Sequence, residues 1–253
     1  MKKLKSVFML AVAVLMLAAC SSSQLKTQTD GLKGSLPYKI GDVANVSSMD
    51  VADGVLTVEV TVSENNGKVS DLKADSKDLA NCFAQLLFGS KGSFKDLAPY
   101  IKSENASVKI KFVGSSSKES FEGTLSAAEA AKLSEAPSAE QELRNKIALA
   151  NMTCPYPIND DVRLQKRKVD GDNVVFTLSI NHAKYDGKLD QKELKKFFTS
   201  IFTDNEGEMA ATVAAAGKGA KWVYEDADDN SKSKTYTFTP DEVKAIAAAA
   251  QND

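Results

Sequence analysis

The chain has 253 residues, 43% of them hydrophobic, and its 32 basic residues nearly balance its 34 acidic residues. Nucleic-acid-binding domains need a basic stripe and polybasic lipid-binding surfaces need clustered lysines, so these interspersed charges argue against both classes. The length suits one large domain or two domains of about 100 to 120 residues.

The first segment is predicted to be a targeting signal. Lys2, Lys3 and Lys5 precede an apolar run over residues 7–18, which is the layout of a secretory signal peptide. A single-pass membrane anchor is the alternative, but this run is shorter than the roughly 20 apolar residues that a spanning helix needs. We therefore expect the segment to be removed rather than to stay in the membrane.

The end of this segment reads Leu17-Ala18-Ala19-Cys20 and resembles the lipobox of bacterial lipoproteins. The resemblance implies that residues 1–19 are a signal peptide and that fatty acyl groups are attached to Cys20. In bacterial lipoproteins, a serine such as Ser21 after the cysteine implies passage to the outer membrane. Residues 20–34 are mostly polar, so we expect them to form a flexible tether.

Five blocks of sequence recur in the same order at an offset of about 113 to 120 residues. The first set covers 36–43, 55–60, 66–69, 79–87 and 124–129, and its counterparts are 154–162, 175–180, 186–189, 194–202 and 237–242. A period this long indicates two copies of one domain rather than a solenoid. We predict a first repeat domain over 35–135 and a second over 136–253, which begins with a bridging helix.

Each copy has the same predicted elements in chain order. In the first copy they are strands at 44–51 and 55–62, an amphipathic helix at 79–87, a helix at 94–103, strands at 107–114 and 120–125, and a short helix after Ser126. In the second copy they are strands at 162–169 and 174–181, helices at 194–202 and 207–216, strands at 221–226 and 234–238, and a helix after Thr239. Asp-Gly turns join the first two strands, and capping boxes open both final helices. The fold class is therefore α+β, as two tandem β-β-α-α-β-β units, each an antiparallel sheet of four strands with helices on one face.

Two cysteines remain besides Cys20. Cys82 lies on the apolar face of a predicted helix, and Cys154 lies just before a strand of the second copy. In an oxidising compartment they could pair, and the alternative is two small buried apolar side chains.

No residue set singles out a reaction. The only histidine, His182, lacks a nucleophile beside it and has no metal-ligand spacing around it. Residues 186–193 resemble the end of a calcium-binding loop, but His182 and Lys184 stand where oxygen ligands are needed, so a strand-to-helix turn is the better interpretation. The acidic cluster at 225–230 is interpreted as a solvated turn.

Aromatic residues gather on the last predicted hairpin, and Trp222, Tyr224 and Tyr236 form a candidate binding surface. Alternate aromatic positions on strands also fill cores, which is the competing interpretation. We predict a membrane-anchored, non-enzymatic envelope lipoprotein that acts as a binding or structural module, with no cofactor, metal or nucleic-acid partner. The alternative is an envelope hydrolase or glycan-binding protein with its site between the two repeats. In either case the sequence leaves open whether a protein or a glycan is the partner.

Overall fold

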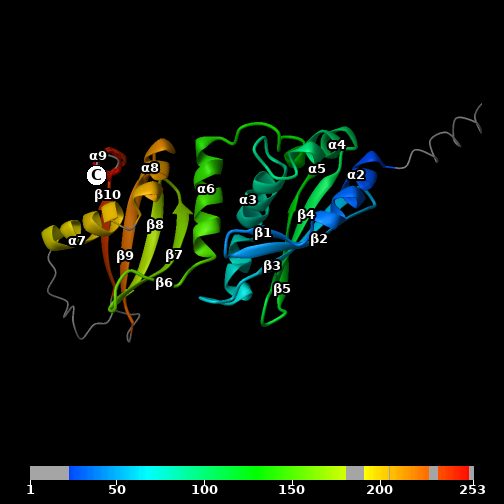
Figure 1. The fold of residues 1–253 in the computed structure, drawn as a ribbon. Helices are drawn as coiled ribbons and strands as arrows, with labels where there is room; N and C mark the ends of the chain where they lie inside the picture. Colours follow the sequence, from blue (N-terminus) through cyan, green and yellow to red (C-terminus); the bar gives the residue numbers. More distant parts are fainter. Residues whose placement is uncertain (1–22, 181–190, 205, 228–232, 251–253) are drawn as a thin grey trace, which may run out of the picture.

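The protein consists of two halves, each built from one five-stranded sheet and the helices that cover it (Figure 1). The computed structural model describes residues 23–180, 191–204, 206–227 and 233–250. The α+β class predicted from the sequence is confirmed. Within the described ranges, no helix is both long enough and apolar enough to cross a membrane.

The first half begins and ends with a helix. In chain order its elements are α2 (Gln24–Leu32), the 3-10 helix η1 (Lys33–Ser35), β1 (Tyr38–Ile40), β2 (Ala44–Ala52), β3 (Val55–Val62), the 3-10 helix η2 (Val69–Asp75), α3 (Ser76–Phe88), the 3-10 helix η3 (Lys95–Leu97), α4 (Ala98–Ser103), β4 (Ser107–Gly114), β5 (Ser120–Leu125) and α5 (Ala127–Ala130).

The second half follows the same series. Its elements are α6 (Ala139–Asn151), β6 (Tyr156–Pro157), β7 (Val162–Asp170), β8 (Asn173–Ile180), α7 (Gln191–Asp204), α8 (Gly207–Ala215), β9 (Gly219–Asp226), β10 (Ser233–Phe238) and α9 (Pro240–Ala250).

The two sheets have the same strand order. The first is ordered β1-β2-β3-β4-β5, and the second has β6 to β10 in the same succession. The central pair is parallel in each, β3 with β4 and β8 with β9, whereas the other neighbours are antiparallel. The prediction of a four-stranded antiparallel sheet is therefore wrong.

The reason for the difference lies in the helices between the central strands. Parallel neighbours need a long connection that returns the chain to the same end of the sheet. Helices α3 and α4 form this connection between β3 and β4, and α7 and α8 form it between β8 and β9. The fifth strand of each sheet, β1 or β6, is a short edge strand that begins at the tyrosine of the repeated Pro-Tyr pair.

The second strand of each sheet also carries a β-bulge at the same place. The register of β2 shifts between Val46 and Ser48, and that of β7 shifts between Leu164 and Lys166. A bulge puts two residues opposite one residue of the neighbouring strand. Residues of β2 and β7 can therefore be matched by their distance from the bulge. Counted from the bulge, Met49 of the first half and Arg167 of the second occupy equivalent positions.

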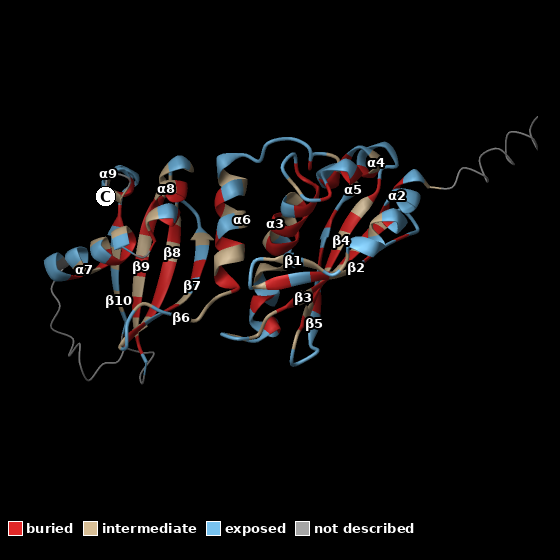
Figure 2. Ribbon diagram, viewed as in Figure 1, coloured by how far each residue is buried: buried red, intermediate tan, exposed pale blue. Residues whose placement is uncertain are grey.

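Each half has its own hydrophobic core, and α6 contributes to both. Ala148 of α6 and Met152 at its C-cap pack in the first core, whereas Leu143 and Ile147 pack in the second. Figure 2 shows buried residues on the strands and helices of both halves, and α6 stands between them. Because this one helix is covered on two sides, it holds the halves together.

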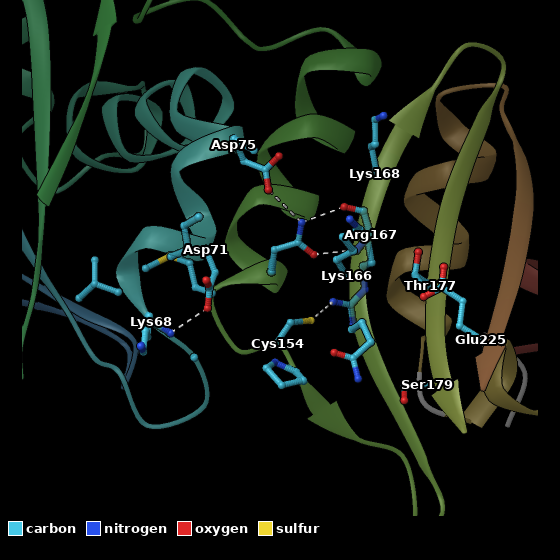
Figure 3. Close-up of a pocket in the computed structure, with 18 of the residues that line it drawn as sticks. Lys68, Asp71, Asp75, Cys154, Lys166, Arg167, Lys168, Thr177, Ser179 and Glu225 are labelled. Carbon is cyan, nitrogen blue, oxygen red and sulfur yellow. Dashed lines mark hydrogen bonds between the residues drawn. The ribbon is translucent and has the colours of Figure 1, made fainter. Parts of the chain in front are cut away.

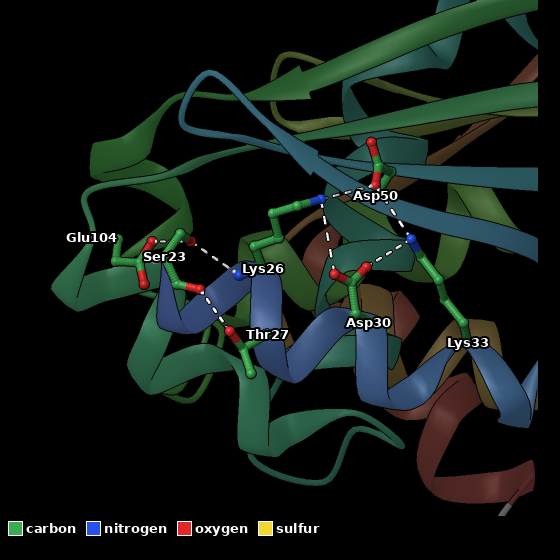
Figure 4. Close-up of polar contacts among 7 residues, drawn as sticks. All are labelled: Ser23, Lys26, Thr27, Asp30, Lys33, Asp50 and Glu104. Carbon is green, nitrogen blue, oxygen red and sulfur yellow. Dashed lines mark hydrogen bonds and ion pairs between the residues drawn. The ribbon is translucent and has the colours of Figure 1, made fainter. Parts of the chain in front are cut away.

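Helix α2 replaces the flexible tether that the polar composition predicts. Ser23 caps it, with its side chain accepting a hydrogen bond from the Lys26 amide, and Leu25 is completely buried in the first core. Glu104, just after α4, accepts a hydrogen bond from the Ser23 hydroxyl at 2.5 Å (Figure 4). It also accepts one from the Leu25 amide at 2.7 Å. A helix with so few apolar residues is stable here because the rest of the first half supplies its partners.

We expect Leu25→Ala to lower the free energy of unfolding by about 3 kcal/mol, because it removes a fully buried side chain and leaves a cavity. Urea unfolding of the chain from residue 21 onward, followed by circular dichroism, measures this change. Gln28→Ala is the matched control, since Gln28 is exposed on the same helix. An equal effect of the two substitutions would show that α2 does not contribute to the core.

Candidate functional site

A cavity of about 830 Å³ lies between the two halves. Its lining comes from the end of β3 and from η2 in the first half, from Asn151 at the end of α6 and the residues just after it, and from β7, β8 and β9 in the second half. Clefts between packed units are favoured places for ligands. This cavity is therefore the candidate functional site.

Charged side chains of both signs line the cavity. Lys68, Asp71 and Asp75 lie on the first-half side, and Lys166 and Lys168 lie on β7 (Figure 3). The positive charges of the two β7 lysines act on Asp75 across the cavity. A ligand there would meet cationic and anionic groups at once.

Strand β8 adds hydroxyl groups to the wall. Thr177 and Ser179 line the cavity and alternate along the strand with the core residues Phe176 and Leu178. Side chains alternate between the two faces of a strand, so these hydroxyls face away from the second core. Glu225 on β9 completes this wall with a carboxylate.

Asn151 joins the two halves at the edge of the cavity. Its buried side-chain amide accepts a hydrogen bond from the Arg167 backbone N–H at 2.9 Å and donates to the Arg167 carbonyl at 2.8 Å. The same amide group donates to Asp75 in the first half at 3.4 Å. Asn151 thus takes the place of a neighbouring strand along β7.

A buried ion pair involves the side chain of the same Arg167. The Arg167 guanidinium donates to both carboxylate oxygens of Glu206, which is the N-cap residue of α8. Both side chains are 5% exposed. Arg167 also donates to the Cys154 sulfur at 3.5 Å, so a guanidinium, a carboxylate and a thiol form one contact group. We call Cys154, Arg167 and Glu206 the buried polar trio.

The first half has apolar residues at the equivalent places. Met49 corresponds to Arg167 by the bulge, and Leu36 corresponds to Cys154 by the repeated Pro-Tyr pair. Phe94 corresponds to Glu206, because each is the N-cap of the helix after the first crossover helix, with φ and ψ of −120° and 33° against −124° and 23°. The polar trio is therefore a property of the second half alone, on the side where the cavity lies.

The ionisation of these groups follows from their surroundings. Burial disfavours the charged form of Arg167, but the hydrogen bonds and charge of Glu206 outweigh it and raise the pKa of Arg167 above its ordinary value. Burial raises the pKa of the Cys154 thiol, and Arg167 opposes this only in part. A thiol that stays protonated is a weak nucleophile, so Cys154 is better suited to packing than to covalent chemistry.

Asp75 is a partly buried carboxyl group in the wall of the cavity. Burial raises its pKa above the ordinary value, and the hydrogen bond from Asn151 opposes the shift. Charged groups, hydroxyls and one poorly solvated carboxyl suit the reversible binding of a polar ligand.

The predicted aromatic surface is not a surface. Trp222 is completely buried, stacked on Phe176 with ring centroids 4.3 Å apart, and Tyr224 is 5% exposed. Tyr236 is partly buried and packs against Phe238 in the same core. The competing interpretation of these rings as core is correct, because alternate positions on β9 and β10 point toward the covering helices.

The structure describes only some of the other residues that the sequence analysis singled out. Cys20 and His182 lie outside the described residues, as does most of the calcium-loop-like segment at 186–193. Cys82 and Cys154 are both free, and burial raises the pKa of Cys82 to about 12. In the described ranges, no three His, Cys, Asp or Glu residues are placed to hold a metal ion.

The sequence interpretation missed Arg167, Glu206 and Asn151. Arg167 reads as one of many charges on a polar strand, and Glu206 reads as an acid at a helix start. One signal was present, since the duplicated pattern sets Arg167 beside an apolar Met49. A charge where the other copy has a core residue indicates a buried polar group with a partner.

We expect Arg167→Met alone to destabilise the second half by about 3 to 5 kcal/mol, because it leaves the Glu206 carboxylate buried without a partner. The double variant Arg167→Met, Glu206→Phe copies the first half and should recover most of this loss. Urea unfolding followed by the fluorescence of Trp222, the chain's only tryptophan, reports on the second core. A double variant no more stable than the single one would contradict the equivalence of the two pairs.

No family model and no curated protein matches the sequence. One similar solved structure is a Pseudomonas aeruginosa protein assigned to the secreted proteins, with a TM-score of 0.35 and 16% identity over 42% of this chain and 92% of that chain. Another is the type 2 secretion system pilotin of Vibrio vulnificus, with a TM-score of 0.32 and 11% identity over 42% of this chain and 87% of that chain. Both likenesses span less than half of the present chain.

Proposed function

We propose that this chain is a lipoprotein of the bacterial cell envelope that is anchored by acyl groups on Cys20 and acts as a non-enzymatic binding module. The observation that carries the binding role is the cavity of about 830 Å³ lined by side chains from both halves. The anchoring is supported by the basic start, the apolar run and Leu17-Ala18-Ala19-Cys20. Ser21 after the cysteine supports the outer membrane as the destination.

The two halves are proposed to descend from one duplicated unit. Their sheets share strand order, a parallel central pair and a bulge in the second strand. Duplication supplies the binding site in a simple way, because the cavity forms where one copy packs against the other. The departures of the second copy from the first, at the buried polar trio, then lie next to the site.

The cavity chemistry supports a polar ligand that carries charge. Lys166 and Lys168 on one wall and Asp71 and Asp75 on the other can each neutralise an opposite charge, and the hydroxyls of β8 can hydrogen-bond to it. A hydrolase or glycan-binding protein is the second candidate, and the raised pKa of Asp75 favours it, since a protonated carboxyl can act as a general acid. Among the described residues that line the cavity there is no aromatic ring onto which a sugar could stack.

The anchoring predicts that full-length protein made in bacteria carries acyl groups on Cys20 and begins at that residue. Mass spectrometry of the membrane-extracted protein measures both. Cys20→Ser should leave the protein unacylated and release it from the membrane fraction, whereas Cys154→Ser should not change its location. An intact N-terminus without acyl groups would contradict the proposal.

The binding role predicts capture of a ligand through the cavity. The chain from residue 21 onward is immobilised and exposed to detergent-solubilised envelope, and the retained molecules are identified. Lys166→Glu with Lys168→Glu should abolish retention, whereas Lys91→Glu with Lys95→Glu, the same charge change on exposed residues outside the cavity lining, should not.

The outcome separates the candidate functions. A molecule held equally by both double variants would show that the cavity is not the site. A glycan that is cleaved on incubation, with cleavage lost in Asp75→Asn, would favour the hydrolase instead.

A further inference from the structure

We infer that the end of the first half that carries the N-terminus of α2 rests against the membrane surface. This inference rests on the anchoring at Cys20 proposed above. It concerns how the anchored protein is oriented, which the sequence pattern does not specify.

The start of α2 is held by several independent contacts. Glu104 accepts hydrogen bonds from the Ser23 hydroxyl and the Leu25 amide, and Leu25 and Thr29 are completely buried. Farther along the helix, Lys33 pairs with Asp30 at 2.7 Å and with Asp50 of β2 at 3.4 Å (Figure 4). Releasing α2 would break these contacts together, so Ser23 is a fixed point on the first half.

Only Ser21 and Ser22 separate Cys20 from this fixed point. Three residue steps span at most about 11 Å even when fully extended. The headgroup layer of one leaflet is roughly 5 to 8 Å thick, taken from the total and hydrocarbon thicknesses of a bilayer. With its acyl groups in the hydrocarbon, Cys20 therefore keeps Ser23 within a few ångströms of the headgroups.

The expected tether would have placed the protein differently. A flexible chain over residues 21–34 has a root-mean-square length of roughly 20 Å. Such a tether would let the first half turn freely above the membrane. Because α2 is folded, that freedom is lost.

The surface next to Ser23 defines the membrane-facing end. It includes the last turn of α4 with Lys102, then Glu104 and Asn105, and the Asp53-Gly54 turn, whose Gly54 carbonyl accepts from the Ser107 amide at 3.0 Å. The charges there are of both signs, so covalent distance rather than attraction to anionic lipid holds this end in place. Figure 1 shows α2 at one end of the molecule and α7 and α9 at the other, which directs the second half away from the bilayer.

Tryptophan fluorescence in vesicles tests this orientation. Full-length acylated protein is reconstituted into phosphatidylethanolamine and phosphatidylglycerol vesicles that contain a lipid with a nitroxide on its headgroup. The native Trp222, buried in the second core, reports on the far half. Lys102→Trp adds a second tryptophan at the proposed membrane end, and we expect this added emission to be quenched several-fold more strongly than that of Trp222.

Ser116→Trp is the matched control in the same half. Ser116 is exposed in the turn after β4, whereas Lys102 lies before that strand, and the eight residues of β4 separate the two ends by about 25 Å. The added emission at position 116 should be quenched weakly. Equal quenching of the two added tryptophans in acylated protein would overturn the orientation while leaving the anchoring intact.

A variant with a longer linker tests whether the short connection to Cys20 causes this orientation. Insertion of about ten glycine and serine residues between Ser22 and Ser23 restores a flexible tether of some 18 Å root-mean-square length, and it should remove most of the quenching at position 102 without changing acylation. Unchanged quenching would show that something other than the short connection holds this end at the membrane. Protein without acyl groups on Cys20 by mass spectrometry would overturn both the anchoring and the orientation.

Discussion

The packing of α6 on two sides is the constraint on which the rest of the structure depends. A helix must bury each apolar stripe against a partner, and α6 directs Leu143 and Ile147 into one core and Ala148 into the other. Arg144 on the same helix forms an ion pair with Asp78 of α3 at 3.6 Å. The halves therefore cannot separate without exposing part of a core, and the cavity between them is formed before any ligand arrives.

The buried polar trio distinguishes the second half from the first although their sheets have the same strand order. In the first half, Met49 and Phe94 fill these positions with buried apolar side chains. In the second half, Arg167 and Glu206 must pair to offset the free-energy cost of burying two charges. Exchanging an apolar pair for an ion pair gains little stability. Arg167 and Cys154 lie at the edge of the cavity, where Asn151 bonds to the Arg167 backbone and continues the polar contacts to Asp75 in the first half.

Local sequence patterns predicted the individual elements well. The alternation of Leu56, Val58 and Val60 located β3, and all three are completely buried. The capping box of Ser126 with Glu129 is present, and hydrogen bonds from Lys77 and Ser126 lower the pKa of Glu129 to about 2 although burial opposes them. These features depend on residues close together in the chain, which is why the sequence reveals them.

Features that depend on distant contacts were not predicted. Parallel pairing of β3 with β4 depends on the crossover helices rather than on the strands themselves. Helix α2 contains little apolar surface, and its stabilising contacts include one from Glu104, 79 residues from Leu25. Arg167 and Glu206 are 39 residues apart, and neither residue type indicates burial. Only the comparison of the two similar halves of the sequence carried information on such distant contacts.

The position of Asn151 has a consequence for how copies of this chain can associate. Strand β6 pairs with β7 only at Arg163 and Leu164, so β7 would otherwise offer unpaired backbone groups beyond them. Open strand edges invite pairing with another molecule and lead to aggregation. By occupying the N–H and carbonyl of Arg167, Asn151 blocks that edge with a side chain. A second molecule would therefore find no free strand edge at Arg167 onto which a polymer could grow.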